Sequence, residues 1–232
     1  MQEIGQIEAI FRYPVKSMRG ESLETATLGW HGLDGDRRLA LRRLDNHGEV
    51  PWLTASKLPE LVLYTPLGDG RVRTPDGAEL PVFGDELAAD IGRRHGAPVE
   101  MMQLKHGIFD EGSISVITSD TVGWLCRRAE TSPDVRRFRP NIVVRPSGAL
   151  PFEEDRWVGG TLTFGDTDDA PAISVTLRDE RCAMVNYDPD DARTNPKVMK
   201  AVVRANQNHC GVYGTVTRTG RVAVGQRIIL RR

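Results

Sequence analysis

The chain has 232 residues, of which 39% are hydrophobic and 27% charged, and its net charge is −1. This length suits one large or two small domains with a substantial core. A net charge near zero, without blocks of one sign, argues against a nucleic-acid partner, so we expect a small-molecule partner. No apolar run approaches the roughly 18 residues that a membrane helix needs, and the N-terminus lacks a signal-peptide pattern. We therefore expect a cytoplasmic protein without membrane contact.

Most of the chain is predicted to form short strands that are separated by glycine and proline. There are 23 glycines and 14 prolines, spread along the whole length. The predicted strands share runs of Val, Ile, Leu or aromatic residues. In chain order they cover residues 5–12, 38–42, 61–65, 141–145, 172–177 and 227–230.

Helical periodicity is confined to three segments. The first covers residues 86–95, with Asp85 as its candidate N-cap. The second begins at Ser119 or Asp120, and the third begins at Asn195, a capping residue followed by proline at the first helical position. The sequence therefore predicts a mainly β protein with a few helices packed on it. The Gly-Ala-Pro stretch at 96–98 is the best candidate boundary, which gives predicted domains at 1–97 and 98–232.

The three cysteines are widely spaced and form no CxxC pair, which excludes a disulfide framework, a cysteine zinc site and an iron–sulfur cluster. Cys126 lies on the apolar face of a predicted helix, and we expect it and Cys210 to be inert core residues. Cys182 directly follows Arg181, and a neighbouring cation favours the thiolate, the form that ligates soft metals. The negative charges of Asp179 and Glu180 raise the pKa of the thiol, so the neighbours of Cys182 do not decide between a metal-ligating thiolate and an unreactive thiol.

Basic residues recur at predicted strand ends. Lys16 and Ser17 follow the Tyr13-Pro14 turn, where they either belong to a solvated loop or hold phosphate oxygens by charge-assisted hydrogen bonds. Arg37 and Arg38 enter the next strand and are candidates for the same anion. Because strand side chains alternate, we expect one of these two arginines to point inward and the other outward.

A second group of polar residues flanks Pro140. Arg139 precedes this proline and Asn141 follows it, at the entrance of an apolar strand. The alternatives to a binding role are a surface ion pair for Arg139 and a strand-capping turn for Asn141.

Taken in order, these motifs resemble the molybdenum cofactor sulfurase C-terminal (MOSC) domain family. The matching stretches are YPVKS, GDR, FRPNIVV, and an Arg-Cys pair followed six residues later by Asp-Pro-Asp. The segments TASKLPELVLY, PFEEDRWVGGTLTFGD and GRVAVGQRIIL also match. The chain is most similar to the two-part members that carry an N-terminal β-barrel segment, including the amidoxime-reducing members and their bacterial relatives, and the resemblance covers nearly the whole chain.

The resemblance implies a β-barrel MOSC fold after an N-terminal β-rich segment, and a molybdenum cofactor (Mo-molybdopterin) with one cysteine ligand to the metal. Pyridoxal phosphate is not an expected cofactor. By position, the resemblance assigns metal ligation to Cys182, phosphate contacts to Lys16 and Ser17, further pterin or phosphate contacts to Arg37, Arg139 and Asn141, a place beside the ligand to Arg181, and a place near the metal, with proton handling, to Asp110.

The activity that the resemblance implies is the reduction of N-hydroxylated or N-oxide-type small molecules. The chain ends at Arg232 without the ferredoxin-like tail of some bacterial relatives, so we expect electrons to come from a separate flavin or iron–sulfur protein. Two alternatives stay open: a sulfur carrier with a persulfide on Cys182, and a non-enzymatic carrier of the molybdenum cofactor.

Overall fold

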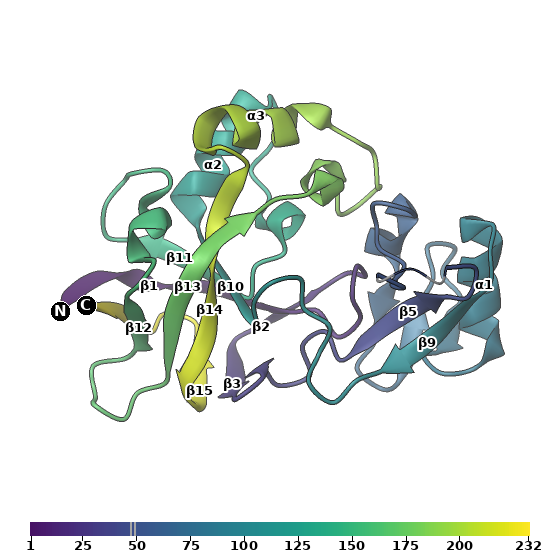
Figure 1. Cartoon of the computed structure of the whole chain (residues 1–232), viewed down its shortest axis with the longest axis horizontal. Coiled ribbons are helices and arrows are strands. Elements are labelled where there is room, and N and C mark those ends of the chain that lie inside the picture. The colour runs from purple at the N-terminus through teal and green to yellow at the C-terminus, as the bar shows by residue number, and fades with distance from the viewer. Residues whose placement is uncertain (47, 49) are drawn as a thin grey trace.

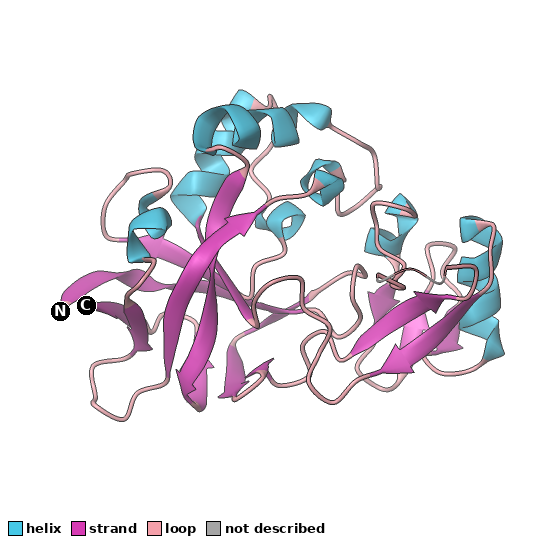
Figure 2. Cartoon of the chain, viewed as in Figure 1, coloured by secondary structure: helices cyan, strands magenta, loops and turns pink. Residues whose placement is uncertain are grey.

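The structure is a computed structural model that describes residues 1–46, 48 and 50–232, and it consists of a β-barrel with a smaller lobe beside it (Figure 1). Strands predominate, and the longer helices near the barrel lie together at one end of it (Figure 2). The predicted mainly β fold with a few helices is thus confirmed.

Seven strands of the described chain close the barrel. They follow one another in the order β11-β10-β14-β13-β12-β16-β1, and pairing between β1 and β11 completes the ring. The pair β10–β11 is parallel and the other pairs are antiparallel. The seven strands are β1 (Gln2–Arg12), β10 (Ile114–Thr118), β11 (Ile142–Pro146), β12 (Thr161–Phe164), β13 (Ala172–Glu180), β14 (His209–Arg218) and β16 (Arg227–Arg231).

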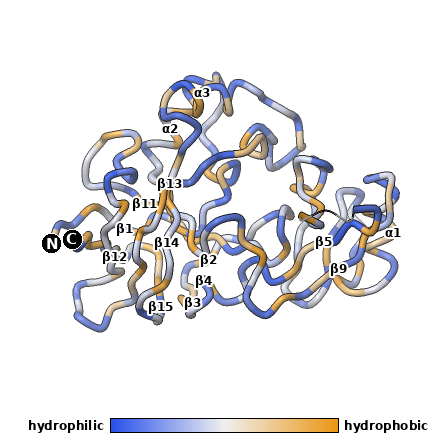
Figure 3. Tube along the Cα trace, viewed as in Figure 1, coloured by the Kyte–Doolittle hydropathy of each residue, from blue (hydrophilic) through white to orange (hydrophobic). Residues whose placement is uncertain are grey.

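Strand β1 shows how the sequence fills the barrel. Ile4, Ile7 and Ile10 are all buried in its core, at intervals of three rather than two. Register shifts in the pairing of β1 with both neighbours account for this spacing, because a bulge changes which face later residues occupy. Gly5 lies at one shift with φ +147°, and a Cβ there would lie 2.1 Å from the carbonyl oxygen of Arg145. Hydrophobic residues recur along the barrel strands (Figure 3).

Short strands extend the barrel at one edge. Strand β2 (Glu21–Leu23) pairs with β1, and β3 (Thr25–Gly29) pairs with both β4 (Gly32–Leu33) and β15 (Gly220–Ala223). The strand pairing therefore groups β1 to β4 with the C-terminal half of the chain. The predicted boundary at residues 96–98 lies between α1 (Asp85–His95) and β9 (Val99–Gln103), inside the smaller lobe.

The smaller lobe has its own hydrophobic core. One of its segments differs from expectation: residues 61–65, predicted as a strand, form the end of the 3₁₀ helix η1 (Pro59–Leu63) and the start of β6. Pro59 suits the first helical turn, and Leu61 and Val62 are both buried in the core of the lobe. The lobe also contains β5 (Leu39–Arg43), β6 (Thr65–Pro66), β7 (Arg71–Arg73), β8 (Glu79–Pro81), α1 and β9.

Side-chain caps define two of the helices. Asn195 accepts a hydrogen bond from the Lys197 amide, which confirms the predicted start of α3 (Pro196–Asn206). Thr118 caps α2 (Ser119–Arg128). The predicted cap Asp85 is instead the first residue of α1, behind Gly84, whose left-handed φ of 129° suits a residue without a side chain. In the part of the chain that the structure describes, no helix has the length and apolarity that crossing a bilayer requires.

Glu154 is a buried carboxyl group that ties η3 (Glu153–Trp157) to the start of α2. Its Oε2 accepts hydrogen bonds from the hydroxyls of Thr118 and Thr121, both at 2.9 Å. Burial raises the pKa of Glu154 to about 7 from the ordinary value of 4.5, although these hydrogen bonds oppose the shift. Between about pH 4.5 and pH 7, the folded protein therefore keeps a proton on Glu154 that the unfolded chain has released.

Because the folded-state pKa is the higher one, stability from Glu154 is complete below about pH 4.5 and is lost as the pH rises through 7. We expect this to remove about 3 to 4 kcal/mol of unfolding free energy across that window, at about 1.4 kcal/mol per pKa unit. Urea unfolding from pH 4 to 8 measures the slope. Glu154→Gln should make the slope smaller, with a remainder from Asp179, whose pKa is raised to about 6, whereas Glu86→Gln, at an exposed site, should leave it unchanged. An unchanged slope in Glu154→Gln would assign the pH dependence to another group.

Candidate functional site

A cavity of about 360 Å³ lies between the barrel and the smaller lobe, a volume typical of ligand pockets. Thr54 and Ser56 line it from the lobe, and Tyr213 lines it from strand β14 of the barrel. Of the eight residues predicted from the sequence, the cavity brings together Lys16, Ser17, Arg37, Asp110, Arg139, Arg181 and Cys182.

Lys16 and Ser17 are buried in the wall of this cavity, not placed on a solvated loop. Their exposed fractions are 6% and 4%. The amide of Lys16 donates to the Leu39 carbonyl at 2.8 Å, which attaches the turn to β5. The Lys16 Nζ donates to Asp110 Oδ1 at 2.6 Å and to the Ile108 carbonyl at 3.3 Å. An ammonium group thus faces the cavity with one carboxylate partner.

Asp110 lies at the rim of the cavity, with 71% of its side chain exposed. Partial burial alone would raise its pKa, but the charge and hydrogen bond of Lys16, with smaller effects of Arg37 and Arg139, lower it. Asp110 is therefore ionised at neutral pH, and in the described chain its contact with Lys16 uses only Oδ1.

Arg37 is fixed from both sides. Its guanidinium pairs with the buried Asp36, and its Nη2 donates to the Arg139 carbonyl at 3.0 Å. Arg38 instead donates to the Lys105 carbonyl and does not line the cavity. The two arginines diverge as expected, but Arg37 precedes β5 in a left-handed conformation, so strand alternation is not the reason.

Arg139 is a cation without an acidic partner. Its Nη1 donates to the Met18 carbonyl at 2.7 Å, and its guanidinium lies 4.1 Å from the centre of the Tyr13 ring. Among the described residues no carboxylate forms a salt bridge with it, and its Nη2 is buried without a hydrogen-bond partner. Burial lowers the pKa of Arg139 to about 10, so the group stays charged. A buried unpaired charge is costly, and a bound anion would relieve that cost.

Three polar residues of the cavity share an uncommon backbone conformation. Ser17, Arg37 and Arg139 have φ values of 68°, 48° and 50°. Residues other than glycine rarely adopt this left-handed region, and each costs about 1–3 kcal/mol unless the surroundings enforce it. This conformation occurs at three of the four predicted contacts to phosphate or pterin within the cavity, and at five described residues outside it: Glu130, Phe152, Ala192, Gln207 and Asn208.

Cys182 is exposed and lines the cavity, at the start of η4 (Ala183–Asn186). Cys126 and Cys210 are buried, and burial raises the pKa of both thiols, which agrees with their expected role in the core. In the described ranges, the cavity included, no three His, Cys, Asp or Glu side chains are grouped as a metal site.

Arg181 is adjacent to Cys182 in sequence, but its guanidinium contacts backbone carbonyls and a carboxylate within the protein. It donates to the carbonyls of Cys210 and Phe138 at 2.6 and 2.7 Å and lies 2.8 Å from Asp179. Arg181 therefore fixes the end of β13, from which Cys182 extends into the cavity. Arg181 lies beside the Cys182 residue as its sequence position predicts, but its guanidinium contacts backbone carbonyls and Asp179.

Asn141 lies outside the cavity. Its side chain is 1% exposed, accepts from the Ser115 amide at 3.1 Å and donates to the Phe11 carbonyl at 3.3 Å. This amide links β1 to β10 at the base of the site, so the structure does not bring it to the other candidate residues.

Asp179 and Tyr213 are among the cavity residues that the sequence did not indicate as site residues. Asp179, considered there only as a neighbour of Cys182, is buried, and burial raises its pKa to about 6 against the effects of Arg181 and Ser115. Tyr213 lies on β14, and its strand offers no signal beyond β propensity. Pairing between β13 and β14 brings both to the site, which no local pattern indicates.

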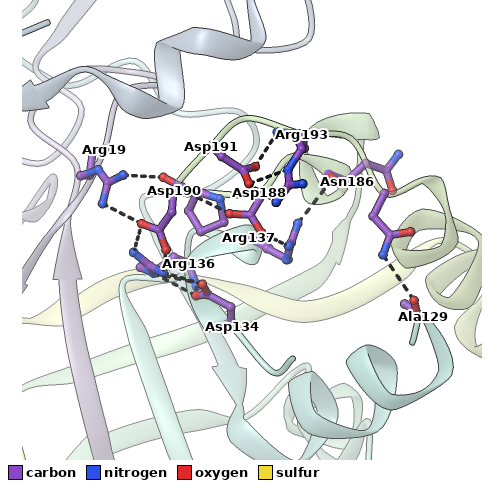
Figure 4. Close-up of polar contacts among 12 residues, drawn as sticks. Arg19, Ala129, Asp134, Arg136, Arg137, Asn186, Asp188, Asp190, Asp191 and Arg193 are labelled. Carbon is purple, nitrogen blue, oxygen red and sulfur yellow. Dashed lines mark hydrogen bonds and ion pairs between the residues drawn. The ribbon is translucent and has the colours of Figure 1, made fainter. Parts of the chain in front are cut away.

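Behind the cavity, a charged network fixes the segment that follows η4 (Figure 4). Asp190 pairs with Arg19 at 3.0 Å and with Arg136 at 2.6 Å, and Asp188 pairs with Arg137. These contacts join the turn after β1, the 3₁₀ helix η2 (Val135–Phe138) and the Asp-Pro-Asp motif. The motif therefore holds the wall of the cavity that carries Cys182.

Residues 92–229 match the MOSC domain, and residues 4–122 match the MOSC N-terminal beta barrel domain. Each match covers more than half of the chain. The chain therefore belongs to the MOSC domain family, in the form that includes the N-terminal beta barrel domain.

Three relatives are informative. Mitochondrial amidoxime reducing component 2 of Bos taurus is 22% identical over 293 aligned positions, which cover 98% of this chain and 84% of that protein. Molybdenum cofactor sulfurase of Oryza sativa subsp. japonica is 24% identical over 81% of this chain, which spans only 29% of that protein. The crystal structure of the YuaD protein from Bacillus subtilis has a TM-score of 0.55 at 16% identity, covering 99% of this chain and 97% of that one. This last likeness concerns the fold.

Proposed function

We propose that the chain is a molybdenum-cofactor-dependent oxidoreductase that reduces N-hydroxylated or N-oxide-type small molecules with electrons from a separate donor protein. The observation that carries the proposal is one cavity that combines an exposed thiol, Cys182, with Arg139, a partly buried cation that has no acidic partner among the described residues. A cofactor with an anionic phosphate and a soft metal requires this combination. The match along nearly the whole length of the bovine amidoxime reducing component supports the same class.

The residues present fit such a cofactor. Arg139 has a free donor and an uncompensated charge for a phosphate or pterin oxygen, and Lys16, Ser17 and Arg37 supply further donors on the same wall. Cys182 would provide the thiolate ligand. When bound, the cofactor would supply the two-electron and oxygen-atom chemistry.

The chain's own contribution to the reaction is positioning and proton movement. Reducing an N-hydroxylated base to the amine consumes two electrons and two protons and releases one water. Asp110 is the proposed proton relay, because its Oδ1 is held by Lys16 while its Oδ2 can accept a proton at the solvent-exposed rim. Since its pKa is lowered, Asp110 would act by accepting a proton and passing it on, not by storing one at neutral pH.

The proposal is tested on protein produced in a host that makes molybdopterin. We expect about one molybdenum per chain and turnover of an amidoxime with reduced viologen. We expect no turnover with NADH or NADPH alone, because the sequence has no GxGxxG stretch between a strand and a helix and no CxxC pair. Metal analysis and substrate loss with each reductant are the measurements.

Each outcome separates one alternative. Protein without molybdenum that carries a persulfide on Cys182 would replace the reductase by a sulfur carrier, a role that the exposure of this thiol also permits. Molybdenum-loaded protein that fails with every strong reductant would favour a cofactor carrier. Activity with NADH alone would show that the chain has a further redox site.

A further inference from the structure

A second, much smaller chamber lies on the other side of Arg139. Its volume is about 30 Å³, and it shares Arg137, Arg139 and Met184 with the large cavity. Gly20 helps to form it: a Cβ at this position would lie 2.4 Å from the Tyr13 ring, so only glycine lets the ring occupy this wall. The volume exceeds the roughly 10–15 Å³ that one water needs but excludes a pterin.

The chamber is lined by donors that lack acceptors. Four buried atoms of its lining residues have no hydrogen-bond partner: the Tyr13 hydroxyl, Arg19 Nε, Arg137 Nε and Arg139 Nη2. Tyr13 and Arg137 are 1% and 6% exposed. Burial raises the pKa of Tyr13 to about 12, so its hydroxyl keeps its proton and can donate. Buried polar groups are rarely left unsatisfied, so four donors at one chamber indicate an occupant that accepts.

The charges around the chamber do not balance. The cluster at the chamber has four arginines and three aspartates: Arg19, Arg136, Arg137 and Arg139, with Asp134, Asp188 and Asp190. Figure 4 shows the ion pairs that the first three arginines form with these aspartates. In the described chain the remaining arginine, Arg139, has no acidic partner, since the nearby Asp36 and Asp110 are paired with Arg37 and Lys16. One positive charge is therefore in excess.

Because four residues that line this chamber each have a buried donor without a partner, and because one positive charge is in excess, we infer that the chamber binds a small monovalent inorganic anion of chloride size. Such an ion accepts from all four donors and neutralises Arg139. Water satisfies neither condition fully, because it must also donate two hydrogens and leaves the charge in place. This site and the proposed cofactor site share Arg139. Its Nη2 carries two hydrogens, so the ion and the cofactor would each accept one of them. The ion would hold Tyr13 and Arg139, and through them one wall of that cavity.

Thermal unfolding of the full chain, with and without cofactor, tests the inference. Chloride is varied at constant ionic strength against gluconate, which is too large for the chamber. The melting temperature should rise saturably with chloride, by about 5 °C or more at a hundredfold excess over the dissociation constant. The rise should occur in both forms. A rise that vanishes in cofactor-loaded protein would mean that the cofactor's phosphate takes this place, and the inference would fail.

Tyr13→Phe removes one donor and keeps the ring. Because a hydrogen bond to a charged group is involved, the chloride concentration at half-maximal effect should increase about tenfold or more. The measured quantity is the chloride-dependent increment, so a general loss of stability does not affect it. Tyr64→Phe is the matched control, since its buried hydroxyl donates to Asp90 in the smaller lobe. Equal chloride responses in the wild type and Tyr13→Phe would overturn the assignment.

Crystals soaked in bromide give a direct reading. We expect an anomalous peak between the Tyr13 hydroxyl and Arg139 that is weaker in Tyr13→Phe. Ordered waters in the chamber with no bromide signal, together with a melting temperature that responds equally to chloride and gluconate, would show that the chamber holds only water.

Discussion

Replacing Cys182 by serine should abolish molybdenum-dependent reduction and leave the fold intact. Cys182 is the exposed thiol of the large cavity, and serine is nearly the same size but a poor ligand for a soft metal. Because the side chain is exposed, the free energy of unfolding should change by no more than about 0.5 kcal/mol. Amidoxime turnover with reduced viologen, molybdenum content and melting temperature are measured on the same preparation.

The other two cysteines are the internal controls. Cys126→Ala and Cys210→Ala alter buried core positions, so they should lower the melting temperature somewhat and retain activity in the folded protein. If Cys182→Ser turned over the substrate as the wild type does, the ligand assignment would be wrong, and the persulfide carrier would be excluded with it.

Replacing Arg139 by alanine should cause the largest loss of cofactor among the basic residues of the cavity. Its guanidinium has a free Nη2 and no acidic partner in the described chain, so its charge is available to the ligand. Losing one charge-assisted contact costs about 1.5–3 kcal/mol, which is a decrease in affinity of about tenfold or more. Lys16→Ala and Arg37→Ala should have smaller effects, because these cations are already paired with Asp110 and Asp36.

Stability of the cofactor-free protein distinguishes binding from a structural role. In chloride-free buffer, the melting temperature of apo Arg139→Ala should equal or exceed that of the wild type, because the substitution removes a cation that has no acidic partner among the described residues. Arg71→Ala, in an exposed ion-pair cluster of the smaller lobe, serves as the control for charge alone and should keep full cofactor occupancy. A drop in apo stability with normal molybdenum content would identify Arg139 as a structural residue.

Local patterns in the sequence determined the mainly β character of the chain and the positions of its three α-helices. Runs rich in Val, Ile or Leu locate β1, β5, β11, β13 and β16, and the Asn-Pro pair locates the start of α3. Each depends on interactions among residues close in the chain. The segment 61–65 shows where this reasoning fails, since its apolar residues suit a strand as well as a helical turn, and burial in the lobe decided for the turn.

The sequence also determined which kinds of residue the site contains, through the order of the motifs from Lys16 to Cys182. Only the tertiary structure decided which of them meet. Barrel closure places segments more than 160 positions apart around one cavity, and the same pairing turns Asn141 and Arg181 toward backbone carbonyls. The tertiary structure also brings Tyr213 to the cavity, and among the described residues it gives Arg139 no carboxylate partner. Contacts between distant segments depend on register, bulges and burial, which local periodicity does not specify.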